Sequence, residues 1–597
     1  MPVTAPTVDR CLDQRDLTEP RFDPTGRRVA FGASAGGVTS LRCVDLSSGE
    51  ERELATDPQP AVGRGMGAGC YAWLPDGTGV VYAGKDGHIY EQSLSGLARR
   101  IDGQHDHGPL HGVSLSADAR LIACVDSLQF LVVIDRSTGD ARRVVHPHGF
   151  TLDPVWIGDT IHWQCWSVPH MPWDQAEIWR ATPPDFVAER FLAMSGATIQ
   201  QPEVSAVDVM GVLSDVNGWL RPCRIDNGEI VPLPMEGESH ECGGPQWGGG
   251  LRSWCWSPRG DHYVVARNLD GFGDLAVVDA RNGNARTLAR GVHGSVSWTR
   301  FGIVAVRTGA VTPTQIVFFA PDTIQRRVLA TSELPCADGS WSDVTLVEPE
   351  IGKVEGVPYR VYRPDGHSGV ADGVLIVWVH GGPTDQWQVT FMPRVAYWVG
   401  QGATVLVVDH RGTTGHGRAF QQSLNGHWGE FDTADVLAVT RHAHREGWGA
   451  PGRTVLMGGS AGGFAALNVA GTDPDICAGV VVSYPVVDLA DAAERSWVYE
   501  QHSVTVLVGD LPRNARLYLQ RSPLGKIASL AKVKVLLMHG DIDPAVPLDH
   551  SVLLAGDLRE LGGDVQLHIF EGEGHGFRQR VNQKREYALI GEFLRTL

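Results

Sequence analysis

A loosely repeated turn between about residues 20 and 332 most constrains how this chain folds. Each copy pairs an aromatic or apolar residue with turn formers such as Pro, Asp and Gly, and short β-branched strands follow. The clear copies lie at residues 22–26, 73–77, 115–118 and 256–260, and weaker ones at 156–159, 204–208 and 298–302. Their spacing of roughly 40 to 50 residues is the period of a four-stranded propeller blade. We therefore predict a seven-bladed β-propeller; a β-sandwich, the alternative, does not require so sustained a period.

The pattern inside one repeat also indicates antiparallel strands. Residues 79–83 and 88–92 alternate as strands around the turn at 85–87, and residues 121–125 and 131–135 repeat this arrangement. Short strands joined by glycine-containing turns are typical of β-hairpins.

The pattern changes after about residue 335. Apolar runs at residues 374–379, 404–409, 479–484 and 533–538 now alternate with helical stretches. Such alternation predicts βαβ units and a mainly parallel, doubly wound sheet. Because 597 residues exceed one ordinary core, we assign residues 1–332 to a propeller domain and residues 333–597 to an α/β domain.

A glycine-framed serine, Ser460, follows a predicted buried strand at residues 453–457 and precedes a helical stretch. In a G-x-S-x-G turn the serine stands at a sharp strand-to-helix bend, and glycines on either side, here Gly458 and Gly462, avoid a clash with neighbouring backbone. In a chain with 72 glycines this motif also arises by chance, so the flanking strand and helix are part of the evidence. We predict that Ser460 is a nucleophile.

A serine nucleophile needs a base and an acid, in the chain order Ser, Asp, His for this arrangement. The aspartate candidates are Asp543 and its rival Asp541, both just beyond a strand ending at residue 538. The histidine candidate is His575, in a glycine-rich loop.

An oxyanion hole completes the expected site, because preorganised N–H groups must meet the charge of the tetrahedral intermediate. Ala461 follows the nucleophile and is one expected donor. The other comes from the loop at residues 380–383, where we prefer Gly382 to Gly381.

The second half resembles the prolyl oligopeptidase family of serine peptidases, nearest to its acylaminoacyl-peptidase and aminopeptidase branch. The matching stretches are HGGP at 380–383, DHRGTTGHG at 409–417, HWGEFD at 427–432, GGSAGG at 458–463, HGDIDPAVP at 539–547 and GHG at 574–576. The resemblance implies an α/β-hydrolase domain preceded by a β-propeller that restricts access. It also implies that Asp543 rather than Asp541 is the triad acid. His416 stands where the family usually has tyrosine, and we expect it to be a structural loop residue.

The resemblance implies short peptides or small amides as substrates. Members that act on free N-termini need a group to neutralise an ammonium, for which we favour Glu500 over Glu494; a solvated helix face is the alternative. Trp497 and Tyr499, with Tyr484, are candidates for an aromatic substrate pocket or for ordinary core packing.

Other features narrow the function. The formal net charge of −18 argues against a nucleic-acid partner. No basic leader or membrane-length apolar run is present, so we expect a cytoplasmic protein without a membrane partner; homo-oligomerisation is left open. We expect no cofactor and no metal. The histidines of two groups are interpreted as solvated loop residues, at positions 105, 107 and 111 and at 146 and 148. Three tryptophans within residues 163–173 either pack together or contact substrate.

The main hypothesis is a serine exopeptidase that removes an N-terminal or acylated residue through an acyl-enzyme. The first alternative is an esterase or small-molecule amidase acting on an aminoacyl-linked metabolite or antibiotic. The second is a non-catalytic propeller scaffold with a relict hydrolase domain, which the complete set of catalytic motifs disfavours.

Overall fold

The computed structural model describes residues 5–63, 69–146, 149–205, 207–237, 239–320, 325–366, 369–495, 500 and 502–597. The chain divides into two compact units. One comprises Arg15–Ser332, and the other combines Met1–Gln14 with Glu333–Leu597. The first 14 residues, which are expected from the sequence to belong to the propeller, group with the C-terminal unit.

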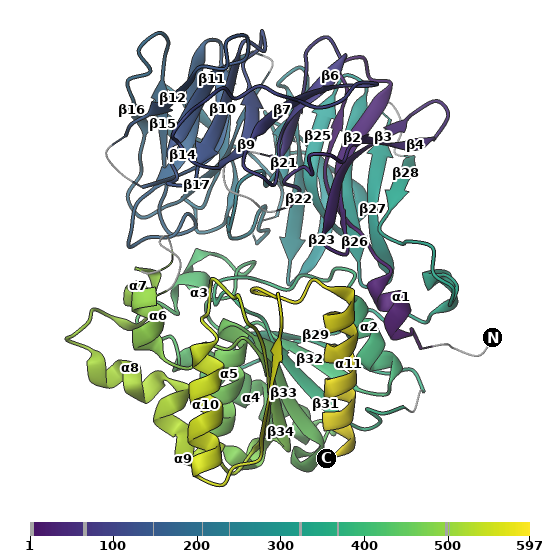
Figure 1. The fold of residues 1–597 in the computed structure, drawn as a ribbon, viewed down its shortest axis with the longest axis vertical. Helices are drawn as coiled ribbons and strands as arrows, with labels where there is room; N and C mark the ends of the chain where they lie inside the picture. Colours follow the sequence, from purple (N-terminus) through teal and green to yellow (C-terminus); the bar gives the residue numbers. More distant parts are fainter. Residues whose placement is uncertain are drawn as a thin grey trace. The chain divides into compact units, whose positions relative to one another are not determined.

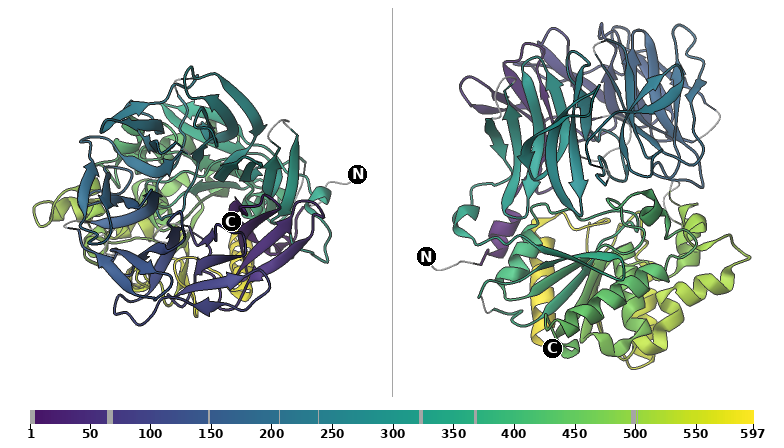
Figure 2. Two further views of the ribbon diagram at one scale, coloured as in Figure 1. Left: turned by 90° about the horizontal axis from the view of Figure 1, so that it is seen from above. Right: turned by 180° about the vertical axis from the view of Figure 1, so that it is seen from behind.

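The Arg15–Ser332 unit is a β-propeller with seven four-stranded antiparallel sheets among its described residues. Figure 2 shows these blades arranged in a ring. Every blade is built from four consecutive strands. The blades are, in order, β1 (Asp16–Phe22), β2 (Arg28–Ala35), β3 (Val38–Asp45) and β4 (Glu51–Ala55); β5 (Tyr71–Trp73), β6 (Gly79–Ala83), β7 (Ile89–Ser93) and β8 (Arg99–Arg100); β9 (Leu110–Leu115), β10 (Leu121–Asp126), β11 (Leu131–Asp135) and β12 (Ala141–Val144); β13 (Phe150–Ile157), β14 (Thr160–Trp166), β15 (Glu177–Ala181) and β16 (Glu189–Leu192); β17 (Ile199–Val204), β18 (Met210–Ser214), β19 (Arg221–Asp226) and β20 (Glu229–Pro232); β21 (Trp254–Trp256), β22 (His262–Leu269), β23 (Phe272–Asp279) and β24 (Ala285–Arg290); β25 (Val292–Thr299), β26 (Gly302–Gly309), β27 (Thr312–Phe319) and β28 (Arg326–Thr331).

The repeated turns predicted from the sequence lie between the first and second strands of the blades. In the first blade, Asp23 Oδ1 accepts the backbone N–H groups of Arg27 and Arg28 at 2.9 and 3.1 Å, and Gly26 adopts φ +72°. An aspartate that accepts nearby backbone N–H groups and a glycine with positive φ are the chemistry of tight turns. The prediction of seven blades is confirmed.

No strand is exchanged between the first and last blades of the described ring, because each blade uses its own consecutive strands. The ring closes instead through a shared hydrophobic cluster that joins residues of β1 and β2 to residues of β26 and β27. Phe22 lies 5.9 Å from Phe318 between ring centroids, edge to face. The N–H of Arg15 donates to the Ser332 carbonyl oxygen at 2.8 Å.

The C-terminal unit is organised around an eight-stranded sheet with the order β29-β30-β32-β31-β33-β34-β35-β36. The six strands from β32 to β36 in this order are parallel to one another, and β29 and β30 are antiparallel. The mainly parallel α/β-hydrolase sheet expected from the sequence is thus confirmed. The strands are β29 (Glu350–Val354), β30 (Val357–Tyr362), β31 (Leu375–Val379), β32 (Thr404–Val408), β33 (Thr454–Gly459), β34 (Gly479–Ser483), β35 (Lys534–Gly540) and β36 (Val565–Phe570).

Helices cover both faces of this sheet (Figure 1). Apolar residues of α4, α5 and α10 share one buried core with β31, β33 and β34, and Figure 1 shows α2 and α11 on the opposite face. The helices are α1 (Val8–Leu12), α2 (Pro393–Gly400), α3 (Arg418–Gln422), α4 (Phe431–Arg445), α5 (Ala461–Thr472), α6 (Leu489–Arg495), α7 (Ser503–Val508), α8 (Ala515–Arg521), α9 (Ile527–Leu530), α10 (Asp549–Glu560) and α11 (Arg580–Arg595), with 3₁₀ turns at η1 (Trp341–Asp343), η2 (Pro451–Arg453), η3 (Pro474–Ile476) and η4 (Pro523–Lys526).

The N-terminal helix α1 is tied to α11 by charge. Arg580 donates to Asp9 and Asp13, each at 2.6 Å, and Lys584 lies 2.5 Å from Asp9. These ion pairs, which sequence periodicity cannot reveal, explain why the first residues group with the C-terminal unit.

The structure corrects the interpretation of the propeller histidines as solvated and decides between the two interpretations of the propeller tryptophans. His105 and His107 are not solvated, because their side chains are 5% and 14% exposed, and His146 is buried as well. His111 is partly buried in β9, and His148 lies outside the described residues. The tryptophans at 163, 166 and 173 are all buried, which favours packing. No helix among the described residues is long and apolar enough to cross a membrane.

Candidate active site

Ser460 lies at the bend between β33 and α5, at the carboxyl end of a central parallel strand. Its backbone has φ +56° and ψ −127°, a conformation that is costly for a residue with a side chain. Its N–H donates to the Ser483 carbonyl oxygen at 3.1 Å, and its carbonyl oxygen accepts the Phe464 N–H at 3.0 Å. These bonds hold the strained turn that the sequence motif predicts.

The two glycines that frame Ser460 are required by close backbone contacts. A Cβ at Gly458 would lie 2.4 Å from the carbonyl carbon of Gly462, and a Cβ at Gly462 would lie 2.3 Å from the carbonyl oxygen of Val379. Real Cβ atoms do not approach other atoms so closely. The glycines therefore let α5 start directly against the end of β31.

His575 and Asp543 come together beyond the carboxyl ends of β36 and β35. His575 Nδ1 lies 2.8 Å from Asp543 Oδ2. Asp541, the rival aspartate, has a different partner, because its Oδ1 accepts the Gly572 N–H at 2.7 Å. The geometry thus distinguishes Asp543 from Asp541, a choice that the motif residues by themselves leave open.

The Asp543 carboxylate is also oriented by backbone. Its Oδ1 accepts the N–H groups of Ala545 and Val546 at 2.9 and 3.0 Å, which leaves Oδ2 for His575. Burial raises the pKa of Asp543, but the hydrogen bond and charge of His575 and the two backbone N–H groups outweigh burial and hold this pKa below its usual value. The carboxylate is therefore ionised at neutral pH.

Ala461 and the glycine loop after β31, which are expected to supply the oxyanion donors, both lie next to Ser460. Ala461 is the first residue of α5, where helix N–H groups have no partner within the helix. Gly381 and Gly382 follow β31, and a Cβ built on Gly381 would lie 3.6 Å from the Ser460 Cβ. Gly382 has φ +121°, which a side chain would strain.

His380, which precedes these glycines, is buried and stacks on His410 with ring centroids 4.7 Å apart. Burial, with a smaller contribution from His410, lowers its pKa to about 3, so the ring is neutral. His380 Nε2 lies 2.7 Å from Thr413 Oγ1. His380 thus anchors the glycine loop.

Tyr484 packs against the candidate base. It follows β34 with φ +40°, its ring centroid lies 4.5 Å from that of His575, and its ring would touch a Cβ at Gly459 at 2.9 Å. Tyr484 is a candidate substrate-binding residue from the sequence, and in the structure its ring contacts the His575 imidazole. A direct contact with substrate stays a prediction.

Of the remaining substrate-binding candidates, Glu500 and its rival Glu494 are among the described residues. Burial raises the pKa of Glu500 to about 7, and the charge of His575 acts in the opposite direction, so these two groups interact. Trp497 and Tyr499 lie outside the described residues. Glu494 is exposed on α6.

A buried ion pair near the glycine loop was missed by sequence reasoning. Arg360 on β30 donates to Asp409, one of its two contacts measuring 2.7 Å, and His416 Nε2 lies 2.8 Å from the same carboxylate. Burial raises the pKa of Asp409, but Arg360 and His416 outweigh it and hold that pKa far below its usual value. His416 thus has the structural role expected from the sequence. The sequence signal for this ion pair is Asp409 itself, a charged residue directly after the apolar strand β32.

Part of the C-terminal unit matches a known protein family. Residues 389–597 match the Prolyl oligopeptidase family. This region is a prolyl oligopeptidase family domain. It contains Ser460, Asp543 and His575, whereas the loop at residues 380–383 lies just before the matched region.

Individual relatives resemble different shares of the chain. The acylamino-acid-releasing enzyme of Sus scrofa is 27% identical over 346 residues, 54% of this chain and 47% of that enzyme. The dipeptidyl aminopeptidase BIII of Pseudoxanthomonas mexicana is 29% identical over 225 residues, 37% of this chain and 32% of that enzyme. The chain thus matches about half or less of the length of these curated relatives.

Solved structures resemble nearly the whole chain. A puromycin-hydrolyzing peptidase of Mycobacterium tuberculosis has a TM-score of 0.86 and 23% identity, covering 99% of this chain and 96% of that one. A puromycin hydrolase has a TM-score of 0.87 and 22% identity, covering 100% and 96%. At this identity the likeness establishes the shared two-part fold.

Proposed function

We propose that the protein is a serine hydrolase of the peptidase type, acting on short peptides or on aminoacyl and acylaminoacyl amides. The observation that carries the proposal is the 2.8 Å contact between His575 Nδ1 and Asp543 Oδ2, in the same unit as a serine held at φ +56° in a strand-to-helix bend. A neutral imidazole held by a carboxylate is the base that serine attack requires.

In the proposed reaction, Ser460 Oγ attacks the substrate carbonyl carbon while His575 Nε2 takes the hydroxyl proton. Asp543 keeps the Nδ1–H bond in place and stabilises the imidazolium. The Gly382 and Ala461 N–H groups donate to the oxyanion. The imidazolium then protonates the leaving amine as the C–N bond breaks, which leaves an acyl-enzyme. Water, deprotonated by His575, releases the acid and restores Ser460.

A free N-terminus in the substrate is proposed to interact with Glu500. Its pKa of about 7 leaves it ionised above neutral pH, where a carboxylate attracts an ammonium group. The propeller is proposed to limit substrate size, as the family resemblance implies.

A small-molecule amidase is the second candidate. It is favoured by the likeness in fold, over nearly the whole chain, to two proteins named for puromycin hydrolysis. Puromycin contains an amide of an aromatic amino acid with a free amino group, so the same catalytic residues would cleave it.

The test is a panel of aminoacyl and N-acetyl-aminoacyl chromogenic amides, the corresponding esters, and puromycin. Wild type should cleave amides with a free or acetylated N-terminus, and Ser460→Ala should lose this activity. Ester turnover with inert amides would instead support an esterase. Equal activity of wild type and Ser460→Ala would refute the nucleophile assignment. Absence of labelling by a fluorophosphonate probe would support a non-catalytic scaffold.

A further inference from the structure

Two histidines and an aspartate converge in the propeller unit, where the second blade leads into the third. His88 ends the turn between β6 and β7, and Asp102 and His105 lie in the connection between β8 and β9. His88 Nδ1 and His105 Nε2 lie 3.0 and 2.9 Å from Asp102 Oδ2. All three atoms lie within 4.8 Å of one another.

We propose that His88, Asp102 and His105 form a binding site for a divalent transition-metal ion, with Zn²⁺ as the best fit. Imidazole nitrogen and carboxylate oxygen are ordinary zinc ligands, and tetrahedral bonds of about 2.0–2.1 Å place ligand atoms about 3.3 Å apart. The two nitrogen–oxygen separations come close to that value, so small side-chain shifts admit the ion. Water completes the coordination.

Contacts outside the three ligands hold Asp102 in position. Its Oδ1 accepts the Ile89 N–H at 3.2 Å and the Arg100 Nε–H at 3.0 Å, so Oδ2 faces both histidines. Hydrogen bonds that orient a ligating carboxylate in this way are typical of metal sites. The Asp102 side chain is completely buried.

The His105 ring is also held in position by its surroundings. His105 is 5% exposed and stacks on His107 with centroids 5.6 Å apart and planes 15° apart. Among the described residues, none offers a hydrogen-bond partner to the buried His105 Nδ1. The polar contact of the ring that the structure shows is made through Nε2, the atom directed at Asp102.

Charge around the site can adjust to a cation. Arg100 now neutralises Asp102, but its side chain is 43% exposed and can turn toward solvent when a metal takes its place. Asp106, next to His105 in the chain, is 99% exposed and adds negative charge nearby.

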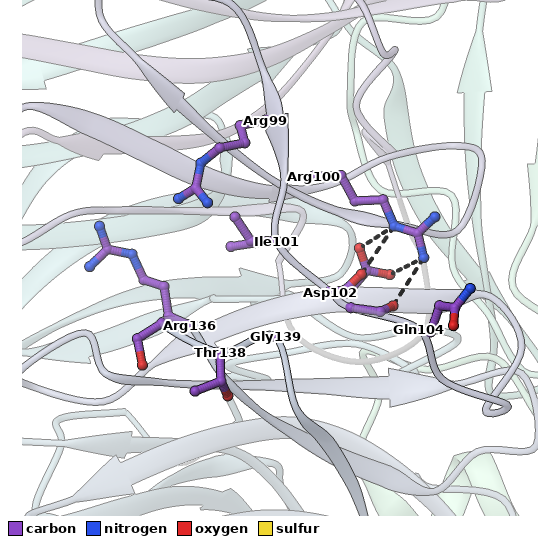
Figure 3. Close-up of a pocket in the computed structure, with 10 residues that line it drawn as sticks. Arg99, Arg100, Ile101, Asp102, Gln104, Arg136, Thr138 and Gly139 are labelled. Atoms are coloured by element: carbon purple, nitrogen blue, oxygen red, sulfur yellow. Dashed lines mark hydrogen bonds and ion pairs between the residues drawn. The ribbon is translucent and has the colours of Figure 1, made fainter.

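Solvent reaches the Asp102 segment through a cavity of about 340 Å³ (Figure 3). The cavity is lined by residues 99–104 and 136–139, and Figure 3 shows Arg100 turned toward Asp102 at its wall. A metal bound here would join the β6–β7 turn to the segment entering the third blade. Its predicted effect is a more stable propeller.

The test uses full-length protein stripped with a chelator and titrated with Zn²⁺ by calorimetry, with bound zinc measured by mass spectrometry. Wild type should bind one Zn²⁺ per chain and show a higher thermal midpoint with zinc. His105→Ala and His88→Gln should each weaken binding at least tenfold. His262→Ala, which removes a partly exposed histidine beside Asp261 in another blade, is the matched control and should bind as wild type does.

Circular dichroism checks that each variant folds. If the variants unfold, the Co²⁺ spectrum of wild type decides, because a tetrahedral site gives intense visible bands. Zinc binding that is absent from wild type, or unchanged in both variants, would show a hydrogen-bonded cluster only and overturn the proposal. These readouts do not depend on peptide hydrolysis, so they are independent of the proposed function.

Discussion

Replacing Asp543 by asparagine should remove nearly all turnover without unfolding the protein. Asp543 Oδ1 accepts two backbone N–H groups, from Ala545 and Val546. The asparagine carbonyl oxygen must take that position, because an NH₂ group there would face two donors. The amide NH₂ then points at His575 Nδ1 and donates to it. This fixes the tautomer that carries its proton on Nε2, which cannot accept the Ser460 proton.

The size of the loss follows from this tautomer. A wrong imidazole tautomer costs about 10,000-fold in kcat in a Ser-His-Asp triad, which is about 5.4 kcal/mol in the activation barrier. The assay is steady-state hydrolysis of a chromogenic aminoacyl amide. Asp541→Asn is the matched control, because Asp541 contacts Gly572, and it should retain activity within about threefold. An Asp543→Asn enzyme within tenfold of wild type, or an equally impaired Asp541→Asn enzyme, would refute the reasoning.

Three further changes test other parts of the structure. Glu500→Gln should raise KM about 10- to 100-fold for substrates with a free N-terminus and leave the KM of N-acetylated substrates unchanged. Because the pKa of Glu500 is about 7, the wild-type preference for free over acetylated N-termini should weaken as the pH falls below 7. The variant should show no such preference at any pH. Gly462→Ala should lower the free energy of unfolding by about 1–3 kcal/mol and reduce turnover, since its Cβ would meet a backbone carbonyl oxygen at 2.3 Å. The control is Gly452→Ala, which has open space around its Cβ and should leave the free energy of unfolding unchanged in chemical denaturation. Asp409→Asn should lower the free energy of unfolding by about 3–5 kcal/mol in chemical denaturation, because it leaves Arg360 buried without its counter-charge. The pKa of Asp409 is held far below its usual value. The stabilisation by this ion pair in the wild type is therefore present above the pKa of the unfolded state and is lost only as the pH falls into the acid range.

Each of these changes has an outcome that would contradict it. For Glu500 it is an equal rise in KM for free and acetylated substrates. For Gly462 it is wild-type stability and turnover. For Asp409 it is a denaturation midpoint unchanged at neutral pH.

The sequence predicts features that depend on local backbone chemistry. The blade turns are recognisable because residues such as Asp23 and Gly26 supply the side-chain acceptor and the positive φ that a tight turn uses. The elbow around Ser460 is recognisable for a similar reason, because Gly458 and Gly462 have no room for a side chain. In both cases a short stretch of chain carries the whole constraint.

Features that depend on distant packing were not predictable. His105 is buried against Asp102 and His88, which come from different turns of the chain, whereas the sequence around it has only the composition of a solvated loop. Tyr484 meets His575 through the order of parallel strands rather than through spacing. Likewise, the choice of Asp543 over Asp541 from residues alone depends on which carboxylate the backbone N–H groups direct toward the imidazole.

The self-contained blades determine when the propeller can finish folding. Six blade-to-blade junctions are joined by continuous chain, but the first and last blades meet without a shared strand. Phe22 and Phe318, which pack across that junction, are roughly 300 residues apart, so bringing them together costs about 5 kcal/mol in loop entropy by the logarithmic scaling of a flexible chain. During synthesis on the ribosome, the apolar flank of the first blade must therefore remain exposed to solvent until the seventh blade has emerged.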